Sequence, residues 1–222
     1  MFKAVLFDMD GVIVDTEPLH YKAYHLMFDE VSIKVDENLY SSFTGKSTLE
    51  ICKILCERFQ IKQSPHELVA IKRKHFEYLF NTDTDLQLLD GVLELIKNYH
   101  SHGLTLVLAS SASMLNINRV FKRFDLDNYF KAKLSGADLK ASKPHPEIFI
   151  KATEASGFKI DECMVIEDST NGIEAAKAAG IFCVGYKSLH SVKQDYSKAD
   201  WVISKFSEIH YEIIKTKKPI HF

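Results

Sequence analysis

Short apolar segments recur along the chain, and each is bounded by polar residues. They cover residues 2–7, 104–109, 132–135, 163–166 and 181–185, with residues 201–203 as a last, shorter segment. Uninterrupted apolar runs of this length are typical of strands that are buried on both faces of a parallel sheet. The pattern therefore predicts a buried sheet to which early and late parts of the chain both contribute.

Helical periodicity fills most of the gaps between these segments. Apolar residues recur at helical spacing in residues 92–99, 114–124, 147–155 and 172–179. A regular alternation of strand and helix predicts right-handed βαβ units, with helices covering both faces of a parallel sheet. We therefore predict an α/β fold built on a doubly wound parallel sheet.

Residues 18–88 depart from this alternation, because they contain helix signals but no convincing strand. Ser47 with Glu50 and Ser64 with Glu67 each form the S-x-x-E pattern of a capping box, and apolar residues at helical spacing follow both. This pattern indicates a small helical domain inserted after the first strand. The predicted domains are residues 1–15 with 89–222 for the α/β core and residues 16–88 for the helical domain.

The composition narrows the class of protein. The chain has 222 residues, 46% of them hydrophobic, and its net charge is -2, without the basic excess that nucleic-acid binding requires. No apolar run is long enough to span a bilayer, and Asp8 and Asp10 interrupt the apolar start that a signal peptide would need. We expect a cytoplasmic, monomeric protein whose partner is a small molecule, neither a nucleic acid nor a membrane.

Paired acids follow the first predicted strand directly, as Asp8 and Asp10. In doubly wound sheets ligands bind beyond the carboxyl ends of the strands, so this is a candidate site. Two carboxylates that point to the same side raise each other's proton affinity, and a hard dication relieves that conflict. The alternative, a loop of solvated acids, is disfavoured by the apolar residues on both sides.

Polar residues follow the other predicted strands as well. Their individual signals are weak, because serines often cap helices, a lysine between prolines can lie on the surface, and acids favour helix N-termini. A hydroxyl group suits a phosphate oxygen, and an ammonium can neutralise a phosphoryl group and an aspartate together. These candidates are Ser110, Ser111, Lys143, Glu167 and Asp168. Their shared position at the strand ends is what makes the set informative.

Four segments resemble the motifs of the haloacid dehalogenase superfamily. They are D-M-D-G-V from Asp8, the serine after the second strand, S-K-P-x-P-x-I-F from Ser142, and E-D-S-x-x-G-I-x-A-A from Glu167. The helical insertion is similar to the small cap domain of this superfamily. Within it, the sequence M-F-K-A-V-L-F-D-M-D-G-V-I and the run up to His20 look most like the β-phosphoglucomutase and sugar-phosphatase branch.

The resemblance implies a role for each candidate. Asp8 would attack phosphorus and become an aspartyl phosphate, while Asp10 would protonate the leaving oxygen and then activate water. Mg²⁺ would be bound by Asp8, the main-chain carbonyl of Asp10 and Asp168, with Glu167 assisting. Ser110, Ser111 and Lys143 would bind the phosphoryl oxygens. The expected activity is a Mg²⁺-dependent phosphatase acting on a small phosphorylated metabolite, such as a sugar phosphate.

Two departures from the mutases of this branch favour simple hydrolysis. Thr48 stands where those mutases carry a cap arginine, and the segment 111–114 lacks their lysine. A β-phosphoglucomutase-type mutase nevertheless remains the main alternative.

Other activities are less favoured. A haloacid dehalogenase is disfavoured, because dehalogenase chemistry has no need for Asp10. A phospho-acceptor receiver module is an alternative of another class, but receivers are about half this length and have no helical insertion. A binding protein with a relic site is disfavoured by the full set of acids.

Substrate selection is expected to reside in the helical domain, because the core residues would contact only the phosphoryl group. The candidates are His20, Lys46, Thr48 and Lys74, with solvated polar faces as the alternative interpretation. We expect His20 and Lys46 to reach the substrate when the domain closes about hinges near residues 14–17 and 88–91.

Overall fold

The computed structural model divides the chain into two compact units. One consists of Met1–Asp15 and Gln87–Phe222, and the other of Thr16–Leu86. The structure describes residues 1–43, 47–84, 86–187 and 194–217. Within the larger unit, Val14 pairs with Leu88, so the two stretches of chain that lead to and from the insertion lie side by side.

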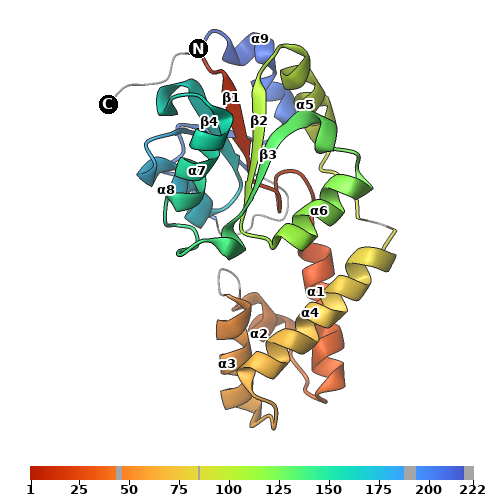
Figure 1. Ribbon diagram of the computed structural model, residues 1–222. Coiled ribbons are helices and arrows are strands. Elements are labelled where there is room, and N and C mark those ends of the chain that lie inside the picture. Colours follow the sequence, from red (N-terminus) through yellow and green to blue (C-terminus); the bar gives the residue numbers. More distant parts are fainter. Residues whose placement is uncertain (44–46, 85, 188–193, 218–222) are drawn as a thin grey trace. The chain divides into compact units, whose positions relative to one another are not determined.

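The larger unit is built on a parallel sheet whose strand order is β3-β2-β1-β4-β5-β6, and Figure 1 labels the strands β1 to β4. The strands are β1 (Ala4–Phe7), β2 (Thr105–Ser110), β3 (Phe130–Ser135), β4 (Cys163–Glu167), β5 (Phe182–Tyr186) and β6 (Trp201–Ile203). β1 lies between β2 and β4, where Phe7 pairs with Leu108 on one side and Ile166 on the other. The predicted doubly wound α/β fold is confirmed.

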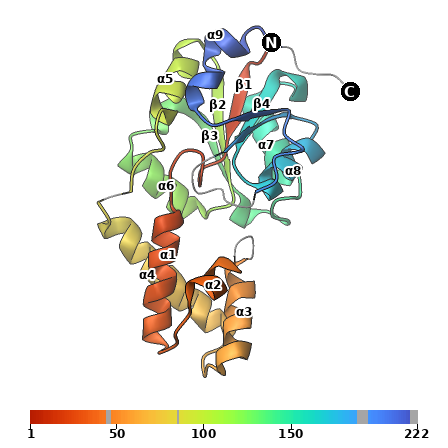
Figure 2. The ribbon, with the colours of Figure 1, turned by 180° about the vertical axis from the view of Figure 1, so that it is seen from behind.

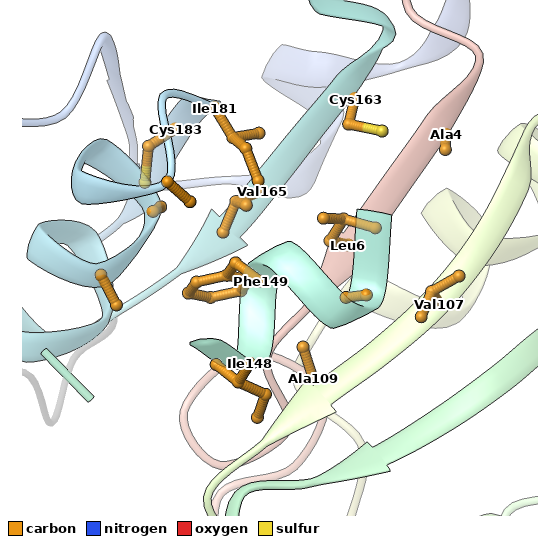
Figure 3. Close-up of a cluster of buried hydrophobic side chains, with 14 of the residues drawn as sticks. Ala4, Leu6, Val107, Ala109, Ile148, Phe149, Cys163, Val165, Ile181 and Cys183 are labelled. Carbon is orange, nitrogen blue, oxygen red and sulfur yellow. The ribbon is translucent and has the colours of Figure 1, made fainter. Parts of the chain in front are cut away.

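Successive residues of β1 point to opposite faces of the sheet, and helices cover each face. Ala4 and Leu6 join a cluster with Phe149 of α7 (Glu147–Ser156) and Ile173 of α8 (Thr170–Ala178), part of which Figure 3 shows. Phe7 faces the other side and contacts Tyr99 of α5 (Val92–Ser101). Figure 2 shows α5 and α6 (Met114–Arg123) from behind, where α6 packs on β3. The short helix α9 (Tyr211–Ile214) packs beside η4 (Phe206–Ile209), which in turn contacts α5.

The smaller unit contains four described helices, α1 (Glu17–Glu30), α2 (Glu37–Ser41), α3 (Thr48–Phe59) and α4 (Pro65–Thr82). Both capping boxes form as predicted, at Ser47 for α3 and at Ser64 for α4. Buried apolar side chains of α1, α3 and α4, including Met27, Leu55 and Leu68, make a separate core. In the described part of the chain, no helix is long and apolar enough to cross a membrane.

Candidate active site

Three adjacent strands deliver polar side chains to one edge of the sheet. β1 is followed by Asp8, β2 ends at Ser110 and β4 ends at Glu167. Lys143, in the segment before α7, joins them: its Nζ lies 2.5 Å from Asp8 Oδ1, 2.8 Å from Glu167 Oε1 and 3.1 Å from the carbonyl oxygen of Ala109. The side chains of Lys143, Asp8 and Glu167 are all at least nine-tenths buried. Two buried carboxylates therefore share one ammonium group.

Glu167 is held from both of its oxygens. Oε1 accepts from Lys143, while Oε2 accepts from the main-chain N–H and the hydroxyl of Ser169 at 2.8 and 2.9 Å. Ser169 also caps α8, because its Oγ accepts from the N–H of Gly172. A Cβ atom on Gly172 would lie 1.7 Å from Glu167 Oε1, so the glycine creates the space for this carboxylate. These contacts suit a residue that orients Lys143.

Burial and neighbouring charges both shift the pKa values of Asp8 and Lys143. Burial raises the pKa of Asp8 to about 7; Lys143 opposes the shift, and the negative charges of Glu167 and Asp10 add to it. Burial alone would lower the pKa of Lys143, but the carboxylates of Asp8 and Glu167 outweigh it and hold that pKa above its ordinary value. Lys143 is thus a permanent cation, whereas Asp8 is poised to gain or lose a proton near neutrality.

The turn after β1 brings Gly11, the residue after Asp10, against the carboxylate of Asp168. The N–H groups of Ile13 and Val14 donate to the carbonyl of Met9, which folds the chain back. Gly11 has a φ of +83°, and a Cβ atom on it would lie 2.2 Å from Asp168 Oδ2. A glycine is required here both for its left-handed backbone and for the close approach of the Asp168 carboxylate.

The residues around this turn fit a hard dication. Carboxylates and main-chain carbonyls are the oxygen ligands that Mg²⁺ takes, and the Gly11 recess places the Asp168 carboxylate beside the Asp8–Asp10 turn. Among the described residues, no three His, Cys, Asp or Glu side chains are grouped so that they could hold a metal ion. The expected ligands are the side chains of Asp8 and Asp168 and the carbonyl of Asp10, with Glu167 assisting. In this structure Glu167 accepts hydrogen bonds from Lys143 and Ser169.

The loop after β2 is held from both sides. Ser110 is fully buried and its Oγ accepts from the N–H of Ala112 at 3.1 Å, while Ser135 donates to the carbonyl of Ala112 at 2.8 Å. The hydroxyl hydrogen of Ser110 is not used in its bond to Ala112 and can be donated to an anion. Ser111 is exposed at the start of the same loop. The loop therefore offers a fixed hydroxyl for a phosphoryl oxygen.

In the helical unit, the half-buried His20 of α1 lies beside a buried lysine of α4 that the sequence pattern did not single out. Lys72 of α4 is only 4% exposed, and its Nζ lies 2.6 Å from His20 Nδ1. Burial, assisted by the charge of Lys72, lowers the pKa of His20 to about 3, so the imidazole is neutral and accepts at Nδ1. Phe76 stacks on the His20 ring at 4.3 Å. The signal in the sequence was the spacing of Lys72, which lies four residues after Leu68 and four before Phe76, at helical spacing with both apolar residues.

The other candidates of the helical unit differ in their surroundings. Thr48 begins α3, is half-buried and hydrogen-bonds to Tyr24 through its side chain. Lys74 is exposed on α4. Lys46 lies outside the described residues. Of the predicted substrate-selecting residues that the structure describes, His20 and Thr48 are thus half-buried and Lys74 is exposed.

The fold and this acidic, lysine-bridged sheet edge define an α/β enzyme. The family model for haloacid dehalogenase-like hydrolases matches residues 5–186, so the chain belongs to that family. It is 35% identical to a phosphorylated carbohydrates phosphatase of Thermotoga maritima over 86% of this chain and 87% of the relative. It is 29% identical to the beta-phosphoglucomutase of Bacillus subtilis, with coverage of 96% and 93%.

A solved structure supports the same grouping. The crystal structure of beta-phosphoglucomutase from Clostridium difficile superimposes with a TM-score of 0.76 at 27% identity, and the match covers 97% of this chain and 96% of that one. The resemblance to the β-phosphoglucomutase and sugar-phosphatase branch, inferred from the motifs, is therefore confirmed.

Proposed function

We propose that this enzyme is a Mg²⁺-dependent phosphatase that hydrolyses a sugar phosphate through an aspartyl phosphate on Asp8. The observation that carries the proposal is the contact of Lys143 with Asp8 at the end of the central strand, 2.5 Å between Nζ and Oδ1. An ammonium group at this distance can neutralise both the nucleophile and an incoming phosphoryl oxygen. The similarity to a phosphorylated carbohydrates phosphatase supports a sugar as the leaving group.

The reaction proceeds in two displacements at phosphorus. In the first, a carboxylate oxygen of Asp8 forms a bond to phosphorus, the ester P–O bond breaks, and Asp10 gives its proton to the leaving sugar oxygen. In the second, Asp10 takes a proton from water, the water oxygen bonds to phosphorus, and the bond to Asp8 breaks to release phosphate. Ser110 and Lys143 hold phosphoryl oxygens throughout. Mg²⁺, when bound, supplies positive charge to the transferring group.

Hydrolysis is preferred over mutase chemistry because of Thr48. A mutase must grip a second phosphate, and a cationic side chain is suited to that task. Thr48 is neutral, and its side chain hydrogen-bonds to Tyr24. The beta-phosphoglucomutase relatives keep a phosphosugar mutase as the second candidate. Assaying glucose 1-phosphate for glucose 6-phosphate as well as free phosphate separates the two.

We also propose that the Thr16–Leu86 unit acts as the cap that selects the leaving group. The support is its separate core and the polar pair formed by the half-buried His20 and the buried Lys72. A preorganised ammonium and a neutral imidazole are suited to sugar hydroxyls or to an anionic group.

The test is a screen of sugar phosphates with Mg²⁺, with an excess of EDTA as the metal-free arm. We expect phosphate release in Mg²⁺ and its loss in EDTA.

Asp8→Asn should abolish both turnover and covalent phosphorylation detected by intact mass. Asp10→Asn should slow turnover by about 10²–10⁴-fold, the range for general acid–base catalysis, while labelling stays detectable. Asp127→Asn, at an exposed aspartate of the same unit, is the control and should match wild type. Normal turnover by Asp8→Asn would refute the nucleophile.

A further inference from the structure

Residues 194–196, which follow β5 in the chain, contact the loop between β4 and α8. Gln194 Oε1 accepts from the N–H and the hydroxyl of Thr170, at 2.8 and 2.9 Å. The N–H of Asp195 donates to the same Thr170 hydroxyl at 2.8 Å. The first N–H of α8 is thus satisfied by a side chain that lies 24 residues further along the chain. We call residues 194–196 the strap.

Tyr196, the last residue of the strap, hydrogen-bonds to the main chain and packs against β5. Its hydroxyl donates to the carbonyl oxygen of Asp168 at 2.9 Å and lies 3.3 Å from the carbonyl oxygen of Tyr186. The ring packs against β5 at Gly185, where a Cβ atom would lie 2.8 Å from Tyr196 Cδ1. Any larger residue at position 185 would push the ring away. The sequence therefore provides both the hydroxyl and the space that lets it reach Asp168.

These contacts hold Asp168 at two points. Its carbonyl oxygen accepts from Tyr196, and its carboxylate lies against Gly11 beside the Asp8–Asp10 turn. The carbonyl carbon and Cβ of Asp168 are both bonded to Cα, so a hydrogen bond that holds the carbonyl oxygen restricts rotation about ψ and, with it, the directions open to the Cα–Cβ bond. Releasing the carbonyl would let the carboxylate swing out of the Gly11 recess. Hydrogen bonds behind a metal ligand commonly change metal affinity 10–100-fold.

We propose that Tyr196 is a positioning residue that sets the affinity for the divalent cation through the backbone of Asp168. The inference rests on the proposed function, because it assigns Asp168 as a ligand. Tyr196 itself contacts neither the phosphoryl group nor the cation. Its effect therefore belongs to cation binding, and it leaves the affinity for substrate at saturating Mg²⁺ unchanged.

The matched pair of variants is Tyr196→Phe and Tyr99→Phe. Both remove a tyrosine hydroxyl that donates to a main-chain carbonyl in the same unit, since Tyr99 donates to Ile209 at 2.5 Å. Only the first touches the Asp168 loop. The readouts are Mn²⁺ dissociation constants by electron paramagnetic resonance without substrate, the thermal midpoint, and KM for p-nitrophenyl phosphate at saturating Mg²⁺. Gln194→Leu loosens the other end of the strap and serves if Tyr196→Phe does not fold.

We expect Tyr196→Phe to weaken Mn²⁺ binding about tenfold with KM unchanged, the lower end of the range for such contacts. Gln194→Leu should also raise the Mn²⁺ dissociation constant. Tyr99→Phe should lower the thermal midpoint and leave the Mn²⁺ dissociation constant unchanged. Unchanged Mn²⁺ affinity in Tyr196→Phe, or an equal loss in Tyr99→Phe, overturns the inference while the proposed function stands. Absence of Mn²⁺ binding by the wild-type protein overturns both.

Discussion

Gly172 is the position at which a single methyl group tests the site most directly. It is the third residue of α8, where an alanine would ordinarily stabilise a helix by about 1 kcal/mol. Here a Cβ atom would lie 1.7 Å from Glu167 Oε1, 1.9 Å from Cδ and 2.4 Å from Oε2. The Glu167 side chain must therefore move, and it cannot keep its contacts with both Lys143 and Ser169.

The cost of Gly172→Ala follows from those contacts. Glu167 accepts three hydrogen bonds, one of them from the Lys143 ammonium. Hydrogen bonds to charged groups contribute about 1.5–3 kcal/mol each. Losing two of them costs about 3–6 kcal/mol, from which the gain in helix propensity of about 1 kcal/mol is subtracted. We expect a net destabilisation of about 2–5 kcal/mol and a fall in kcat, because Lys143 loses one of its two carboxylate partners.

The assay is urea unfolding of four proteins: wild type, Gly172→Ala, Glu167→Ala and the double variant. In the Glu167→Ala background the methyl group meets no carboxylate, so Gly172→Ala should be neutral or slightly stabilising there. The double-mutant cycle then gives a coupling energy of several kcal/mol, well above the roughly 0.5 kcal/mol expected of independent sites. A destabilisation that is the same in both backgrounds would refute the steric account.

Two further predictions concern pH. The pKa of His20 is about 3 in the folded protein and 6.5 in the unfolded chain, so the free energy of unfolding should fall as pH drops from 6.5 towards 3, by up to about 1.4 kcal/mol per pH unit. The variant His20→Asn, which can still accept a hydrogen bond from Lys72, should flatten this slope, whereas His66→Asn at an exposed histidine should not. An unchanged slope in His20→Asn would contradict the argument that burial lowers the pKa of His20. Because the pKa of Asp8 is about 7, protons should compete with Mg²⁺, and the apparent dissociation constant measured by calorimetry should rise up to tenfold per unit below pH 7; a constant value between pH 5 and 7 would exclude Asp8 as a titrating ligand.

The parts of this molecule that follow from local pattern were predictable from the sequence. The uninterrupted apolar run before Asp8 predicted a strand buried on both faces, and every residue of β1 is indeed buried. The topology then brings the ends of β2, β1 and β4 to one edge, which is why Ser110, Asp8 and Glu167 could be grouped before their contacts were known. The capping boxes at Ser47 and Ser64 were equally local signals.

Contacts that depend on long-range packing could not be predicted in the same way. Lys72 was overlooked because lysines usually lie in solvent, and its burial depends on the rings of Tyr24 and Phe76 that flank its ammonium group. Tyr196 gave no signal at all, since its target, the Asp168 carbonyl, is 28 residues earlier and belongs to the main chain. Sequence patterns identify which side chains carry charge, but not which backbone groups hold them in place.

The charges at the sheet edge support the proposal that a cation and a phosphoryl group bind there together. Asp8, Asp10, Glu167 and Asp168 bring four carboxylates to one region, and Lys143 bridges two of them. Burial is the main cause of the raised pKa of Asp8, and the negative charges of Glu167 and Asp10 add to it against the opposing charge of Lys143. Under the proposed function, a dication bound here would favour the ionised form of Asp8 as the nucleophile. Lys143 and the dication would together offset the charge of a phosphorylated substrate, so an arrangement that is unfavourable alone would become favourable when it binds that substrate.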